Sequence, residues 1–145
     1  MDCIDLYRSS CSFSENRHIH AQGAKIATCD INPDLVKTLK DDYPDIYAEV
    51  LDVSDEHAVQ SFCSNALEKL EGLDCLINNA GIAGPTSKIE EIDTSDWAEC
   101  LNICLTSQFL LIKNCVPKLR LSENASIINL SLSLIHISEP TRHTQ

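Results

Sequence analysis

Two acidic residues stand where short apolar segments of the sequence end. Asp30 closes the segment 24–30, and Asp52, which Val53 follows, comes directly after the segment 46–51. A carboxylate at the end of a buried strand can accept hydrogen bonds from both ribose hydroxyls of a nucleotide, and it repels a 2′-phosphate. Two plainer interpretations stay open: Asp30 as a cap of the following helix, and Asp52 as part of the cap of a helix that begins after Ser54.

A third apolar segment, 73–77, leads into a short polar turn. Its residues are Asn78, Asn79, Ala80 and Gly81. A glycine has no Cβ, so Gly81 would let a ligand approach the backbone closely. The alternative is an ordinary turn after a strand, since Asn and Gly are common turn residues.

The elements that would position these residues alternate along the chain. Segments 24–30, 46–51, 73–77 and 125–130 have the character of strands, and helical apolar patterns lie between them, the longest over 94–119. Such alternation predicts parallel strands with right-handed crossovers. The fold class we expect is α/β, a partial Rossmann-like doubly wound parallel sheet with helices on both faces. In such sheets, ligands bind at the carboxyl ends of the strands.

Charge and hydropathy exclude several classes of partner. Eleven Lys and Arg residues against 22 Asp and Glu give a net charge of −11, which argues against nucleic-acid binding. No apolar run approaches 18 residues, so no membrane span is expected. Met1 is followed by Asp2 and Asp5 rather than by a basic and then an apolar stretch, so we expect no secretory signal and a reducing, cytoplasmic location.

The thiols and imidazoles form no recognisable metal pattern. None of the eight cysteines makes a Cys-x-x-Cys pair, and buried thiols packing as small hydrophobes are the expected case. Cys100 and Cys104 share a helix face, which fits core packing or a redox-active pair. His18, His20 and His57 have no ligands at metal-binding spacing. We expect no metal site.

Residues 21–131 resemble the short-chain dehydrogenase/reductase family. The resemblance rests on Gly23 leading to Asp30, on 51–55, on the Asn-Asn-Ala-Gly motif at 78–81, on 96–110 and on 126–131. It implies hydride transfer between a nicotinamide cofactor and a small alcohol or ketone. By the same resemblance, Asp30 would bind the cofactor ribose and favour NAD over NADP. Asp52 and Val53 would flank the adenine, and Asn79, Ala80 and Gly81 would lie along the cofactor ribose.

The amino-terminal part of the chain departs from that family. The three glycines that hold the cofactor diphosphate fall on Leu6, Ser10 and Ser12, where side chains obstruct a phosphate. We therefore expect residues 1–22 to be a degenerate first strand and helix, 23–131 the family core, and 132–145 a tail foreign to the family, either frayed or artefactual. The sheet would then lack its central strand and be marginally stable or aggregation-prone, unless residues 1–12 supply a substitute.

The residues of the family's chemistry are absent as well. Its catalytic Asn position is Cys104, its Ser position is Leu132, and no Tyr-x-x-x-Lys pair occurs in the sequence. We therefore predict no catalytic residues, doubtful cofactor binding, and a truncated or degenerate member that is inactive alone.

Two other interpretations remain. The chain is then either a non-catalytic pseudo-enzyme that pairs through the helix 94–119, giving a homo-oligomer, or a gene-model fragment without function. The apolar stripe of that helix consists of Trp97, Leu101, Leu105 and Phe109. It would either face a partner or cover the sheet of its own chain.

Overall fold

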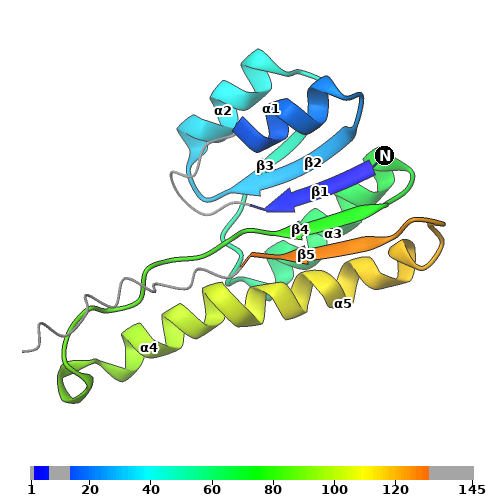
Figure 1. The fold of residues 1–145 in the computed structure, drawn as a ribbon. Helices are drawn as coiled ribbons and strands as arrows, with labels where there is room; N and C mark the ends of the chain where they lie inside the picture. Colours follow the sequence, from blue (N-terminus) through cyan, green and yellow to red (C-terminus); the bar gives the residue numbers. More distant parts are fainter. Residues whose placement is uncertain (1, 7–13, 131–145) are drawn as a thin grey trace, which may run out of the picture.

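A single parallel sheet forms the centre of the molecule (Figure 1). The computed structural model describes residues 2–6 and 14–130. The strand order is β3-β2-β1-β4-β5, and every neighbouring pair is parallel. The strands are β1 (Asp2–Leu6), β2 (Lys25–Asp30), β3 (Tyr47–Val50), β4 (Cys75–Asn78) and β5 (Ser126–Asn129). The α/β fold class expected from the alternating pattern is confirmed.

Helices cover both faces of this sheet (Figure 1). One buried cluster joins β2 and β3 to α2, with Ile19 of α1 against it, and the larger one packs β1 and β4 against α3 and α5. The helices are α1 (Ser14–Ala21), α2 (Pro33–Asp42), α3 (Glu56–Leu70), α4 (Thr94–Leu101) and α5 (Ser107–Leu119), with a short 3-10 turn η1 (Ile89–Glu91) and a π-helical turn η2 (Asn102–Thr106). No helix in the described ranges is long and apolar enough to cross a membrane.

The central position of the sheet is filled by β1, so the alternative in which residues 1–12 supply this strand is confirmed and the gap does not occur. β1 pairs with β2 on one side and with β4 on the other; Leu6, for example, is the register partner of both Cys29 and Asn78. Cys3 and Ile4 of this strand are fully buried. Five residues are enough to form the central strand because the backbone groups on both sides of it find hydrogen-bond partners and Cys3 and Ile4 pack into the core. Tertiary contacts therefore override a weak local strand signal.

The long helix over 94–119 is continuous but not uniform. α4, η2 and α5 follow one another without a break, and η2 introduces a π-helical turn in the middle. The residues that face the core are Ile103, Leu110, Leu111, Cys115 and Leu119. The stripe of Trp97, Leu101, Leu105 and Phe109 is instead exposed, so the interpretation that it covers the sheet is wrong.

Candidate functional site

The candidate site is the edge of the sheet at which its parallel strands end. β1 lies between β2 and β4, and the chain crosses over to opposite sides of it, so the strand order reverses beside this strand. Doubly wound sheets bind ligands at such a switch point. Asp30, the turn at 52–53 and the turn at 79–81 all follow strands at this edge, which brings together three chain segments that are distant in sequence.

Asp30 is the buried acid of this edge. Its Oδ1 accepts a hydrogen bond from the backbone N–H of Asn32 at 2.7 Å. Burial raises the pKa of the Asp30 carboxyl, and the backbone N–H groups of Asn32 and Ile31 oppose that rise only in part. The cap of α2 is Asn32, whose side chain accepts from Asp34 and Leu35, so the interpretation of Asp30 as the helix cap is wrong. Its carboxylate instead fixes the turn that leaves β2.

Asp52 shapes the turn after β3. Its Oδ1 accepts from the backbone N–H of Ser54 at 3.0 Å and from the Ser54 hydroxyl at 2.8 Å. The cap of α3 is Asp55, which accepts from the N–H of Ala58, so the expected cap at Ser54 is one residue off. Val53 is buried in the larger core cluster. The turn therefore places a half-buried carboxylate next to a side chain that is buried in the core.

The loop after β4 rests on a thiol. The backbone N–H of Ile82 donates to Sγ of Cys104 at 3.5 Å, and the Cys104 thiol donates back to the Ile82 carbonyl at 3.6 Å. Gly81 lies just before this contact, with the position of an added Cβ 4.0 Å from the same sulfur. Cys100 approaches Gly84 in the same way, at 3.3 Å from an added Cβ. The two thiols of α4 and η2 thus pack against the loop at the candidate site.

Cys104, which the sequence comparison predicts to stand at the family's asparagine position, contacts the backbone of Ile82. Asn102, the nearest asparagine, accepts instead from the hydroxyl of Thr106 at 3.4 Å, one turn along its own helix. Ser10, Ser12 and Leu132 lie outside the described residues.

The sequence analysis placed Asn78 in a turn and did not predict that its side chain is buried at this edge. Asn78 ends β4, and its Nδ2 donates to Oδ1 of Asn129 at the end of β5, at 2.7 Å. Its own Oδ1 is buried and has no hydrogen-bond partner in the part of the chain that is described. An amide at the last position of an apolar strand was the available signal, because such a group needs a partner when it is buried.

The remaining polar candidates do not assemble into a second centre. Within the described ranges, no three His, Cys, Asp or Glu side chains meet in an arrangement that could hold a metal ion. His20 pairs with Asp45 at 2.6 Å, and the hydrogen bond from His20 lowers the pKa of that exposed carboxyl.

The expected burial of thiols is confirmed for Cys3, Cys29, Cys63, Cys75 and Cys115.

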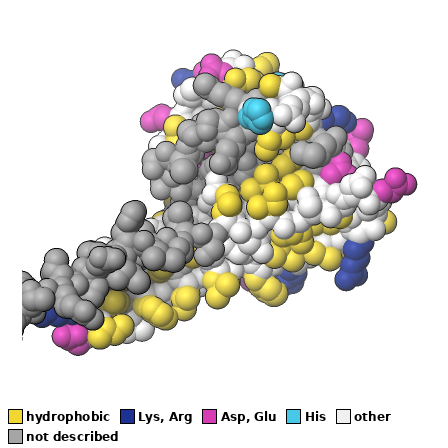
Figure 2. Space-filling model, in the orientation of Figure 1, with side chains coloured by type: hydrophobic (Ala, Val, Ile, Leu, Met, Phe, Trp, Pro, Cys, Tyr) yellow, Lys and Arg dark blue, Asp and Glu magenta, His cyan; other side chains and the backbone are white. Residues whose placement is uncertain are grey.

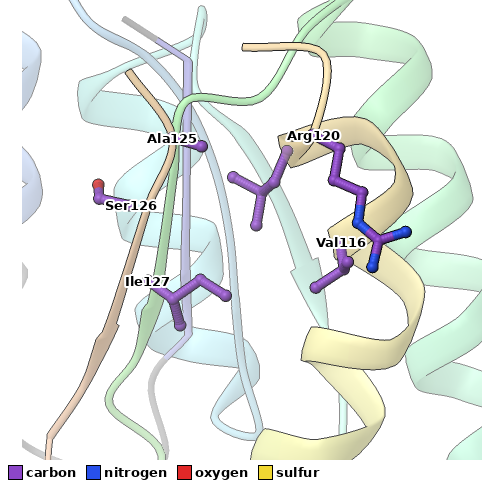
Figure 3. A pocket seen from close by; sticks show the side chains of 6 residues that line it. Val116, Arg120, Ala125, Ser126 and Ile127 are labelled. Carbon is purple, nitrogen blue, oxygen red and sulfur yellow. The ribbon is translucent and has the colours of Figure 1, made fainter. Parts of the chain in front are cut away.

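A small apolar groove lies at the opposite end of the sheet. It has a volume of about 240 Å³ between the end of α5 and the beginning of β5. Figure 3 shows Val116 of α5 and Ile127 of β5 reaching towards each other across it. Its other lining residues are Leu119, Arg120, Ala125 and Ser126. Because β5 begins here, the groove is separate from the edge that carries Asp30.

The exposed stripe forms the outer surface of the long helix. The exposed fractions are 54% for Trp97, 40% for Leu101, 63% for Leu105 and 60% for Phe109. Figure 2 shows hydrophobic side chains along the lower edge of the molecule, where α4 and α5 run in Figure 1. Four large apolar side chains on one helix face are more than the scattered exposure expected of a monomer surface.

The fold and its carboxyl edge define a Rossmann-like α/β domain. Residues 8–144 match the sequence profile of the family described as "Enoyl-(Acyl carrier protein) reductase". The chain belongs to the short-chain dehydrogenase/reductase family.

Relatives and solved structures agree with this assignment. The chain is 33% identical over 110 residues to the rat "Dehydrogenase/reductase SDR family member 6", covering 76% of this chain and 42% of that protein. It is 36% identical over 115 residues to the "CLA biosynthesis dehydrogenase/reductase" of Lactiplantibacillus plantarum, and this match covers 76% of this chain and 40% of that protein.

Two crystal structures share its fold. A short-chain dehydrogenase from Streptomyces avermitilis superposes with a TM-score of 0.78 at 21% identity, covering 90% of this chain and 49% of that one. The 3-ketoacyl-(acyl-carrier-protein) reductase of Brucella melitensis, solved with NADH, superposes with a TM-score of 0.70 at 22% identity. The match covers 79% of this chain and 49% of that one. The matched part of the chain thus spans less than half the length of each of these four proteins.

Proposed function

We propose that this chain carries the adenosine half of an NAD site from a short-chain oxidoreductase and does not catalyse hydride transfer by itself. The observation that carries the proposal is the buried carboxylate of Asp30 at the end of β2, next to the central strand. An acid in this place can accept hydrogen bonds from both hydroxyls of the adenosine ribose. Its charge repels a 2′-phosphate, so NAD is favoured over NADP.

The other turns of the edge suit the same half of the cofactor. Asp52 holds the turn after β3 and would meet the exocyclic amine of adenine, with Val53 beside the ring. Asn79, Ala80 and Gly81 would lie along the cofactor ribose. NAD, when bound in a complete enzyme of this family, accepts the hydride from an alcohol substrate or returns it to a ketone.

The diphosphate side fits the cofactor poorly. Leu6 stands at the first glycine position of the family and is the last paired residue of β1. In the family, a glycine at this position lets the backbone approach the cofactor diphosphate, and a residue with a Cβ would obstruct that approach. We therefore expect this chain to contact the adenosine of the cofactor and to bind its diphosphate only weakly.

The reacting side lacks the family's proton-transfer groups. No Tyr-x-x-x-Lys pair occurs in the sequence, and the thiol of Cys104 packs against Ile82 at the asparagine position. A thiol bound to backbone cannot replace an amide that holds a relay water. We therefore expect no oxidation of alcohols or reduction of ketones by residues 1–145 alone.

A titration followed by amide NMR shifts tests the proposal directly. Millimolar NADH should shift the amides of Asp30, Val53 and Gly81, and NADPH at the same concentration should shift them less. A matched Asp34→Asn variant, altered on the exposed first turn of α2, should respond as the wild type does. Saturable micromolar binding, turnover of any alcohol or ketone, or shifts confined to other surfaces would each contradict the proposal.

A second candidate function is pairing through the long helix. The observation that favours it is the exposed stripe of Trp97, Leu101, Leu105 and Phe109. Two such stripes packed against each other would remove all four side chains from water, and apolar burial stabilises association by about 25 cal/mol per Å² before its entropic cost. We infer a homodimer or a complex with an intact relative, and light scattering over a range of concentrations tests it. A monomer at every concentration would contradict it.

A further inference from the structure

Two buried thiols face each other across the packing of α3 and α5. Sγ of Cys63 and Sγ of Cys115 are 3.9 Å apart, and the Cys115 thiol donates a hydrogen bond to Cys63. The exposed fractions are 2% and 0%, and both residues belong to the larger core cluster. They lie 52 positions apart in the sequence, so the fold alone brings them together.

The geometry brings the two sulfurs within van der Waals contact. A disulfide places its sulfurs about 2.05 Å apart. The sulfurs of Cys63 and Cys115, 3.9 Å apart, must therefore approach by about 1.9 Å through rotation of the side chains and movement of the helices. This pair takes no part in the site at the carboxyl edge, whose thiols are Cys100 and Cys104.

We propose that Cys63 and Cys115 are a covalent modification site, which hydrogen peroxide closes into a disulfide between α3 and α5. The Cys63 thiolate attacks one peroxide oxygen, the O–O bond breaks, and hydroxide leaves to become water after taking a proton. The sulfenic acid now on Cys63 is attacked by the sulfur of Cys115. The S–O bond breaks, and the departing hydroxide combines with the Cys115 proton as a second water. Two thiols and one peroxide give one disulfide and two waters.

The surroundings assign the two roles. The hydrogen bond from Cys115 lowers the pKa of Cys63, while that hydrogen bond and burial raise the pKa of Cys115. Cys63 is therefore the thiol that reacts with peroxide, because the thiolate is the nucleophile, and Cys115 is the one that resolves the sulfenic acid. Because both thiols are buried, the oxidant that reaches them must be small.

The bond would stabilise the layer that supports β1 and β4. Ile4 and Leu76 pack into the same cluster as the two cysteines. A cross-link between positions so far apart in the chain restricts the unfolded ensemble, so the oxidised chain should resist unfolding more than the reduced chain. Reduction by dithiothreitol should cancel the difference.

Peptide mapping of the intact chain tests this site. The chain is treated with hydrogen peroxide, unfolded, alkylated with N-ethylmaleimide and digested with trypsin. Cleavage after Lys40, Lys69, Lys113 and Lys118 releases residues 41–69 and 114–118, in which Cys63 and Cys115 are the sole cysteines. The expected result is a linked pair of these two peptides that disappears after reduction, together with a higher urea midpoint for the oxidised chain.

Two controls separate the native geometry from random pairing. Cys75→Ala removes another buried thiol and should leave the link intact, whereas Cys63→Ala should abolish it. Peroxide added in concentrated urea should give mixed pairs in place of the single link. The proposal is overturned if both peptides of the wild type are recovered alkylated at a dose that oxidises Cys100 or Cys104. It is equally overturned if Cys63 is found as sulfinic acid without any link, or if the unfolded chain gives the same pair as the folded one.

Discussion

The side chain of Asn78 joins the two last strands of the sheet by donating from Nδ2 to Oδ1 of Asn129 at 2.7 Å. Asn78 is buried at the end of β4, and Asn129 is its register partner at the end of β5. The bond therefore ties β5, whose residues are exposed, to the interior of the sheet at the edge that carries the candidate site.

Removing the acceptor of this bond should weaken the fold. Asn129→Ala leaves the buried Nδ2 of Asn78 without a partner, and we expect the free energy of unfolding to fall by about 1–3 kcal/mol. Urea denaturation followed by circular dichroism measures the change. Asn124→Ala, at an exposed position before β5, serves as the control and should change stability by less than about 0.5 kcal/mol. Equal effects of the two substitutions would show that the amide pair contributes nothing.

Truncating the central strand should cost more. Ile4 is fully buried in the larger cluster, to which Leu76 and Cys29 also belong, so Ile4→Ala should lower the free energy of unfolding by about 2–5 kcal/mol. The measurement is again a denaturation curve, with Val50→Ala, half-exposed on β3, as the matched control. A neutral Ile4→Ala would mean that the first strand does not occupy the middle of the sheet in solution.

The raised pKa of Asp30 predicts a pH dependence of stability with a definite sign. In the unfolded chain this carboxyl titrates near its ordinary value of about 3.9, and burial raises its pKa in the folded chain. The folded state then holds more protons between the two values, so stability from this group is present below the unfolded pKa and is lost as pH rises through the folded pKa. Asp30→Asn cannot ionise and retains an oxygen that can accept from the N–H of Asn32.

The free energy of unfolding of Asp30→Asn should therefore rise relative to wild type as the pH rises above about 3.9, the ordinary value of the carboxyl. Denaturation curves at several pH values measure this difference. Asp34 lies on the exposed surface of α2, so the difference in the free energy of unfolding between Asp34→Asn and wild type should not change with pH in this way. A constant difference between Asp30→Asn and wild type would refute the assignment.

A charge placed in the exposed stripe should abolish pairing. Leu105 lies near the middle of the stripe and is well exposed, so Leu105→Glu should leave the fold intact while placing like charges opposite each other in a dimer. The mass from light scattering should fall to that of the monomer. Ile89→Glu places the same charge at an exposed apolar residue of η1 outside the stripe and should leave the mass unchanged. A dimer that survives Leu105→Glu uses another surface.

How much of this molecule the sequence determines differs between its parts. The alternation of apolar segments and helical patterns determined the α/β class, because those signals are local and depend on backbone conformation. The same local reasoning placed the acid of β2 and the turn after β4 at one edge, since parallel strands end together.

Only the tertiary structure decided the rest. The segment Asp2–Leu6 has charged residues at its first and fourth positions and so lacks a clear apolar strand pattern. It becomes a strand because two neighbouring strands offer hydrogen bonds on both sides. The long helix has apolar residues on two faces, and its contacts with β4 and α3 decide that Ile103 and Leu111 face inward while Leu105 faces water. Cys63 and Cys115 are distant in sequence and meet only through helix packing. Long-range contacts of this kind depend on the shape of the whole core, which no local pattern of residues encodes.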